Sequence, residues 1–142
     1  MQKNFQILII VCVVCAALLF PSCDSIDKGE YYSQKENYIN VTGTLEHIAY
    51  NDDCTVLYLS FSDLSASLDD MCFKIVGDNL QIVKENGIDE KLEVGDQVTF
   101  VTAPKYFGDG YVMPIVAISA DEEELLKLED GISNLMKWLK AT

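Results

Sequence analysis

The sequence predicts a mainly β protein with five strands, one short helix between the third and fourth strands, and a helical segment at the C-terminus. Three observations support this fold class. Two successive segments alternate between apolar and polar residues, as strands with one buried face do. A short helical pattern that ends at a glycine follows the third strand. Two further β-rich segments then flank a glycine-containing loop, and apolar residues at helical spacing follow.

The first two strands are predicted from their alternation. From residue 39 the first strand places four residues on its inward face: Ile39, Val41, Gly43 and Leu45. His47 continues this inward phase, so we expect a structural histidine rather than a catalytic base. After a turn at residues 51–53, the second strand has an inward face made of Thr55, Leu57, Leu59 and Phe61 and an outward face made of Val56, Tyr58 and Ser60.

Four further elements follow in order. They are a third strand (residues 72–76), a helix (79–86), a fourth strand (98–103) and a fifth strand (112–119). Leu80 and Val83 form one face of the helix, and Gly87 is placed to end it. Pro114 marks a bulge or an edge in the fifth strand, because proline cannot donate to the hydrogen-bond ladder.

The C-terminal segment carries the signals of a helix. Four acids at residues 121–124 suit a helix start, where Asp121 can cap the first turn and Glu124 can complete a capping box. Six apolar residues follow at helical spacing: Leu125, Leu128, Ile132, Leu135, Met136 and Leu139. Gly131 interrupts the segment, which is compatible with one helix or with two. We expect this stripe to pack on the protein's own strands, with docking on a partner as the alternative.

The order of three strands, one short helix and a final strand pair resembles the OB-fold. The resemblance covers residues 38–119, with Gly43 placed to let the first strand curl and a Gly95-Asp96 turn leading into the fourth strand. It implies a closed five-stranded Greek-key barrel. An SH3-like barrel is the nearest alternative, although that fold does not usually place a helix at this point.

The OB-fold resemblance also implies a ligand face. OB-fold proteins bind ligands against the second and third strands, between the loop joining strands one and two and the loop joining strands four and five. In this chain those loops are residues 50–54 and 105–111. The implied ligand-binding residues are Tyr50, Tyr58, Lys105, Tyr106, Phe107, Asp109 and Tyr111. Exposed aromatic residues are typical of surfaces that recognise sugars, peptides or proteins; the alternative is that they plug the barrel end.

The N-terminal segment resembles the signal peptide of bacterial lipoproteins. An apolar run (residues 5–20) follows Lys3 and is shorter than the about 20 residues of a membrane-spanning helix. Phe20 and Ser22 fill the large and small positions of a lipobox that ends at Cys23. This resemblance implies diacylglyceryl transfer to the Cys23 thiol and cleavage before it, and two or more acyl chains anchor a protein stably. An ordinary cleaved signal peptide, for which no A-x-A site is present, and an uncleaved anchor are the alternatives.

The chain therefore divides into four predicted parts. They are a signal peptide (residues 1–22), a polar tether that begins at the acylated cysteine (23–37), the barrel (38–119) and the C-terminal helical segment (120–142). The tether lacks periodicity, and a flexible coil of its length spans about 20 Å. Cleavage before Cys23 would leave 120 residues with nine lysines against 23 acids, a net charge of −14.

This charge narrows the choice of partners. The chain contains no arginine, and recognition of phosphate or guanine depends on arginine and on clustered cations. We therefore expect no nucleic-acid partner. An anionic lipid surface should repel so acidic a domain, so that the lipid anchor rather than charge must hold it at the membrane.

The residues that could carry chemistry form no recognisable constellation. Cys54 and Cys72 are expected at opposite ends of a hairpin, about 20 Å apart, and therefore as two buried thiols rather than a disulfide. Acid clusters at residues 52–53 and at Asp63 with residues 69–70 could attract Ca²⁺, but none matches an ordered calcium loop, and solvated turns explain them better. We expect no metal, no other cofactor and no enzymatic activity.

The sequence thus predicts a lipid-anchored, extracytoplasmic and non-catalytic binding or accessory module of the bacterial cell envelope. The expected partner, besides the membrane, is an envelope protein, a peptide or a glycan. The alternative is a structural interaction protein that docks through its C-terminal stripe, and a hydrolase is a distant third. Burial of the stripe on the protein's own barrel would favour the binding module.

Overall fold

The computed structural model describes residues 28–68, 72–104 and 112–142. The predicted signal peptide and Cys23 lie outside these ranges. The same holds for five of the expected ligand-binding residues: Lys105, Tyr106, Phe107, Asp109 and Tyr111. The expectations placed on these residues stay predictions.

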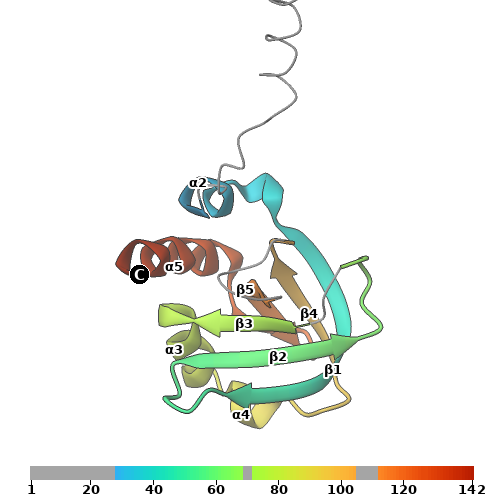
Figure 1. The fold of residues 1–142 in the computed structure, drawn as a ribbon. Helices are drawn as coiled ribbons and strands as arrows, with labels where there is room; N and C mark the ends of the chain where they lie inside the picture. The colour runs from blue at the N-terminus through green and yellow to red at the C-terminus, as the bar shows by residue number, and fades with distance from the viewer. Residues whose placement is uncertain (1–27, 69–71, 105–111) are drawn as a thin grey trace, which may run out of the picture.

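A ring of five strands forms the centre of the molecule. The strands are β1 (Ile39–Tyr50), β2 (Val56–Ser62), β3 (Cys72–Val76), β4 (Gln97–Thr102), β5 (Val112–Ala120) and an additional β6 (Glu123–Leu126). They form one sheet in the order β3-β2-β1-β4-β5-β6, and a parallel pairing of β3 with β5 closes the first five strands (Figure 1). The prediction of a mainly β, five-stranded OB-like Greek-key barrel is confirmed.

Strand β1 joins two parts of this barrel because it bends. Its first half pairs with β4 and its second half with β2. Gly43 lies where the partner changes, and a Cβ there would approach Leu64 Cδ2 to 2.8 Å and Phe61 Cβ to 3.0 Å. The glycine therefore leaves room for the neighbouring side chains on the inside of the bend. This agrees with the prediction that Gly43 lets the first strand curl.

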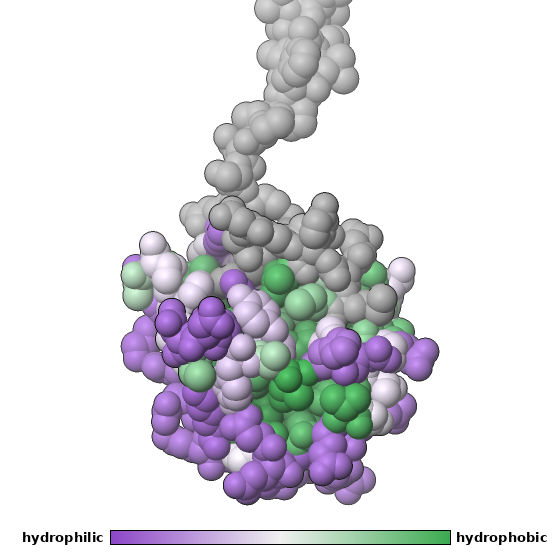
Figure 2. Space-filling model, turned by 60° about the horizontal axis from the view of Figure 1, so that its bottom comes forward, coloured by the Kyte–Doolittle hydropathy of each residue, from purple (hydrophilic) through white to green (hydrophobic). Residues whose placement is uncertain are grey.

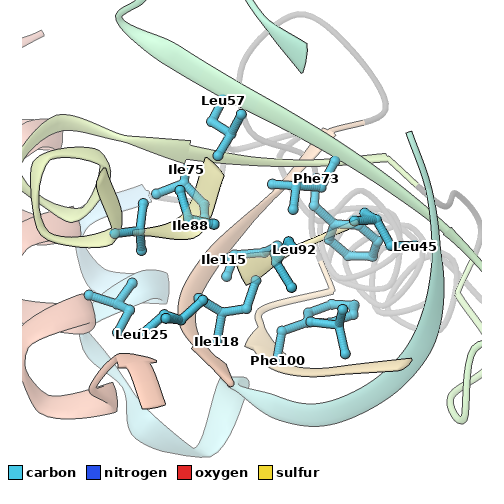
Figure 3. Packing of buried hydrophobic residues seen from close by; sticks show 14 of the residues in the cluster. Leu45, Leu57, Phe73, Ile75, Ile88, Leu92, Phe100, Ile115, Ile118 and Leu125 are labelled. Carbon is cyan, nitrogen blue, oxygen red and sulfur yellow. The ribbon is translucent and has the colours of Figure 1, made fainter. Parts of the chain in front are cut away.

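The barrel interior is an apolar core built from the predicted inward residues. Leu45, Leu57 and Phe73 come from three different strands and point toward one another (Figure 3). The ring of Phe100 stacks on Phe61 at 4.5 Å between centroids and meets Phe73 edge-on at 4.8 Å. Each such buried side chain stabilises the fold by about 1.5–3 kcal/mol.

Two helices close the lower end of the barrel in Figure 1. They are α3 (Gly77–Glu85) and α4 (Ile88–Lys91), which lie between β3 and β4, where the sequence predicted one helix over residues 79–86. Leu80 and Val83 of α3, with Ile88 of α4, are buried in the same apolar core as the strands. Their burial explains why a short helical pattern is stable here, since helices of this length depend on packing.

A second apolar cluster lies outside the barrel. It joins α2 (Lys28–Ser33), a 3₁₀ turn η1 (Lys35–Asn37) and α5 (Leu128–Ala141) to the outer side of the sheet. Tyr32, only 1% exposed, is buried with residues of α5. The prediction of an irregular tether is therefore wrong for residues 28–37, because a single helical turn is too short to show periodicity and its burial supplies the stability.

Helix α5 is one continuous helix that lies directly on β5. A Cβ at Gly131 would sit 1.5 Å from the carbonyl oxygen of Val116. Of the two possibilities left open by the sequence, the structure shows one helix, in which Gly131 permits close approach to the strand. Ile132 and Leu135 are buried against the barrel, and Leu128 is 38% exposed.

The predicted start of the C-terminal helix is wrong. Asp121 and Glu122 form a two-residue turn with positive φ angles of 50° and 64°, and residues 123–126 return along β5 as β6. Such a turn is the usual connection of a tight hairpin. Leu125 therefore lies in the barrel core with Ile118 instead of joining the helical stripe (Figure 3).

Cys54 and Cys72, the two cysteines of the barrel region, are not both buried. Cys54 is exposed in the turn before β2, and Cys72 is half-buried on β3 opposite Ser60. They lie at opposite ends of β2, as expected, and form no disulfide with each other. The expectation of two buried thiols is wrong because Cys54 precedes the strand, in a backbone conformation with a φ of 54°.

The surface at the barrel's lower end is largely hydrophilic, with one hydrophobic area at its centre (Figure 2). Among the described residues, Val94 is the most exposed large hydrophobic side chain, at 65%. In the described ranges, no helix has the length and apolarity needed to cross a membrane.

Candidate functional site

The outward side chains of neighbouring strands line up in two rows across the barrel surface. The first row contains Ala49, Tyr58, Lys74 and Pro114, from β1, β2, β3 and β5, and of these Pro114 is buried. The second row contains His47, Ser60, Cys72 and Val112. We call the four residues of the two middle strands, Tyr58, Ser60, Cys72 and Lys74, the outer β2–β3 face. It coincides with the surface that the OB-fold resemblance implied.

Tyr58 lies in the middle of the first row. Its side chain is 37% exposed, whereas the neighbouring residues Leu57 and Leu59 are buried in the core. Rigid backbone pairing on both sides, with β1 and with β3, holds the ring in place. Tyr58 therefore presents an aromatic ring and a hydroxyl group at little entropic cost, as tyrosines at recognition surfaces do.

Lys74 is the strand partner of Tyr58 on β3, and Trp138 lies near Lys74. The Lys74 Nζ atom lies 5.7 Å from the centroid of the Trp138 ring, a cation–π distance. Burial lowers the pKa of Lys74, and the positive charge of Lys28 lowers it further. Trp138 is held by close contact with Gly77, where a Cβ would approach its Cδ1 atom to 2.7 Å. A partly desolvated ammonium beside an aromatic ring can donate hydrogen bonds to a carbonyl, carboxylate or hydroxyl group of a ligand.

Tyr50 does not belong to this face. It pairs with Leu57 and packs against the barrel core, whereas Tyr58 points outward. The Tyr50 hydroxyl donates a hydrogen bond to Asp89 Oδ1 (2.6 Å), and Lys84 Nζ lies 4.8 Å from the ring centroid. Burial and this hydrogen bond raise the pKa of Tyr50. The prediction that Tyr50 and Tyr58 border one surface is wrong, and Tyr50 instead ties β1 to α4, as the plug alternative described.

His47 lies on the outer surface instead of the expected inward position. The pairing of β1 with β2 shifts between Leu45 and His47, so a β-bulge at Glu46 reverses the direction of the following side chains. His47 is exposed and stands opposite Ser60. No pocket with two carboxylates encloses it in the described part of the chain, which was the arrangement that would have favoured a hydrolase.

Two of the described ranges begin on this surface, at Cys72 and at Val112, which pair with each other in the second row. The predicted binding loop, residues 105–111, lies outside the described residues. Among the described residues, no group of three or more His, Cys, Asp or Glu is placed to hold a metal ion.

Sequence reasoning missed Lys74 and Trp138. Lys74 could have been found, because it occupies the outward phase of the third strand next to the face that the resemblance implied. Trp138 could not, since its position depends on how α5 crosses the barrel. Comparisons with protein-family models, with curated proteins and with solved structures found no match.

Proposed function

We propose that this protein is a lipid-anchored, extracytoplasmic binding module of the bacterial cell envelope that holds its ligand on the outer β2–β3 face. The observation that carries this proposal is the position of Tyr58, an exposed aromatic residue fixed beside Lys74 in the middle of that face. The lipobox resemblance at Cys23 supports the location, and the OB-like barrel supports the choice of face.

The chemistry of the face suits a peptide, a protein segment or a glycan. The Tyr58 ring can stack on an apolar side chain or on the apolar side of a sugar, and Lys74 can donate to carbonyl or hydroxyl oxygens. Ser60 adds a hydroxyl group that can donate or accept. We propose a non-catalytic role because Tyr58 and Lys74 supply contacts for a ligand. Among the described residues, His47 stands opposite Ser60 but forms no hydrogen bond that would activate it.

The alternative is docking of the C-terminal helix on a larger envelope complex. In the described structure Ile132 and Leu135, at the centre of the predicted stripe, are buried on the protein's own barrel. Only Leu128 of the helical stripe is exposed to more than a third. This arrangement favours the binding module, because little of the stripe is left to meet a partner.

Site-specific photo-crosslinking in intact bacterial cells tests the proposal. A photoreactive amino acid is placed at position 58, at position 94 and at position 128 of the full-length chain. Position 94 is the matched control, because Val94 is more exposed than Tyr58 but lies in the turn before β4. We expect a defined adduct from position 58 and none from the other two, and we expect Lys74→Ser to weaken that adduct.

An adduct from position 128 alone would support docking through α5 and contradict the proposal. An adduct from position 94 alone would contradict the proposal and move the ligand to the turn before β4. Digestion of the adduct with protease and with a muramidase distinguishes a protein ligand from a glycan.

A further inference from the structure

We infer that the end of the molecule formed by α2, η1 and the C-terminal half of α5 rests on the surface of a lipid bilayer. This inference depends on the proposed anchor at Cys23 and goes beyond it, because it assigns the side of the domain that meets the membrane. Three observations support it: the short chain between the anchor and the fold, the local charge balance, and the side chains at this end.

The chain leaves little distance between the anchor and the folded domain. Only four residues separate Cys23 from Lys28, where α2 begins. Five Cα-to-Cα steps reach at most about 18 Å, and the headgroup layer of a bilayer is itself about 5–8 Å thick. Helix α2 is packed on α5 through Tyr32, Ile132 and Leu135, so the anchor also draws α5 toward the membrane.

The charge of this end differs from that of the remaining molecule. Helix α2, η1 and α5 together contain four lysines and four acids, so the net charge of −13 is carried by the other residues. The two acids of α5 lie in its first turn, and its lysines, Lys137 and Lys140, lie toward its C-terminus. The α4 end, far from α2 in Figure 1, carries acids such as Asp89, Glu90 and Glu93.

An anionic lipid surface therefore repels the α4 end and not the α2–α5 end. This charge asymmetry would orient the barrel on its anchor. The expectation that an anionic membrane repels the domain then applies to the α4 end and not to the α2–α5 end.

The side chains at the α2–α5 end suit the interface between lipid and water. Tyr31 of α2 and Trp138 and Leu139 of α5 are half-buried, and Lys140 is exposed beside them on the last turn. Aromatic and lysine side chains are enriched where proteins meet headgroups, because each combines an apolar body with a polar end. Trp138 also borders the outer β2–β3 face, so the ligand face would stand beside the bilayer instead of pointing away from it.

Quenching of tryptophan fluorescence tests the inference directly, since Trp138 is the single tryptophan of the chain. The full-length lipidated protein is reconstituted into vesicles of phosphatidylethanolamine and phosphatidylglycerol. The lipids carry bromine either near the glycerol end or near the methyl end of the acyl chains. We expect loss of Trp138 emission with the first set of lipids, less loss with the second, and none for Cys23→Ser, which lacks the anchor.

Charge reversal supplies the matched control. Lys140→Glu should reduce the quenching while flotation with the vesicles is unchanged, and Lys127→Glu, exposed just before α5, should leave both unchanged. Flotation without quenching in the parent protein would overturn the orientation and leave the anchor intact. Failure to float, with no acyl mass on Cys23, would overturn the anchor and this inference together.

Discussion

At the scale of single residues, two close contacts decide how α5 sits on the barrel. Gly131 lies directly over the carbonyl oxygen of Val116, and the buried Asn79 of α3 donates a hydrogen bond from Nδ2 to the carbonyl oxygen of Gly131 (2.9 Å). Asn134 in turn donates to Asn79 Oδ1 (3.1 Å). These contacts tie α5 to both β5 and α3, and therefore place Trp138 at the edge of the outer β2–β3 face.

We predict that Gly131→Ala lowers the free energy of unfolding by at least about 3 kcal/mol, because the new methyl group must displace the helix from β5. Urea unfolding followed by circular dichroism measures this loss. Ser133→Ala, on the exposed side of the same helix, is the control and should stay within about 0.5 kcal/mol of the parent. Equal effects of the two substitutions would contradict the contact.

A second residue-scale prediction concerns Tyr38. Its hydroxyl donates a hydrogen bond to the carbonyl oxygen of Tyr32 (2.6 Å), and burial raises its pKa above the ordinary value. The unfolded chain therefore loses the Tyr38 hydroxyl proton at a lower pH than the folded protein does. Because of this difference, the free energy of unfolding should fall as the pH rises beyond about 10. Tyr38→Phe should cost about 1 kcal/mol at neutral pH but reduce this alkaline slope.

Urea unfolding between neutral and strongly alkaline pH measures the slope. Tyr58→Phe, on the exposed outer face, serves as the control and should keep the parent slope. If Tyr38→Phe also kept the parent slope, the buried phenol would not be the group that couples folding to pH.

At the scale of elements, the predictions from sequence were correct where the apolar pattern of a segment corresponds to the face that it buries. The inward residues of β1 were correct up to Leu45, and those of β2 were correct from Leu57 to Phe61, because alternation indicates a strand with one buried face. Thr55 was wrongly placed on that face, since it is exposed and precedes β2.

The pattern failed where pairing with another element decides the structure. The bulge at Glu46 reverses His47, and pairing with β5 makes residues 123–126 a strand although acids before leucines suit a helix start.

The hairpin between β5 and β6 gives a prediction at this scale. Asp121 and Glu122 both have positive φ angles, which cost most residues about 1–2 kcal/mol and suit Asn-Gly best. Replacing them by Asn-Gly should therefore raise the free energy of unfolding by about 1 kcal/mol. Thermal unfolding measures the change, with Asp52→Asn/Asp53→Gly in the β1–β2 turn as the control. Destabilisation by Asn-Gly would argue against the hairpin.

At the scale of the whole molecule, the barrel could be predicted and the candidate site only in part. Element order was sufficient for the OB-like barrel, and the alternation of the second strand was sufficient for the outward position of Tyr58. Tyr50 was placed on the wrong surface because the pairing of Tyr50 with Leu57 cannot be derived from loop position. Trp138 comes from an element that packs across the barrel, and such tertiary contacts leave no local sequence signal.

The uneven charge predicts how stability responds to salt. The acids outside α2, η1 and α5 include eleven that lie in turns, in α3, in α4 or in β6: Asp52, Asp53, Glu85, Asp89, Glu90, Glu93, Asp96, Asp121, Glu122, Glu123 and Glu124. Salt shortens the range of their repulsion to about 8 Å at physiological ionic strength, so the free energy of unfolding should rise as sodium chloride is added from low concentration. The free energy of unfolding of the Asp52→Asn/Asp53→Asn variant should rise less over the same range of salt. A fall in stability over this range would show that ion pairs outweigh the repulsion.

The proposed location and orientation of the barrel both depend on acylation of Cys23. Intact mass and detergent partitioning of the full-length protein from a bacterial host, beside Cys23→Ser, test this acylation directly. We expect a parent mass that begins at Cys23 and includes acyl chains, with the protein in the detergent phase, and neither property in the variant. Unmodified protein in the aqueous phase for both samples would contradict the lipoprotein assignment and, with it, the proposed position of the barrel on the membrane.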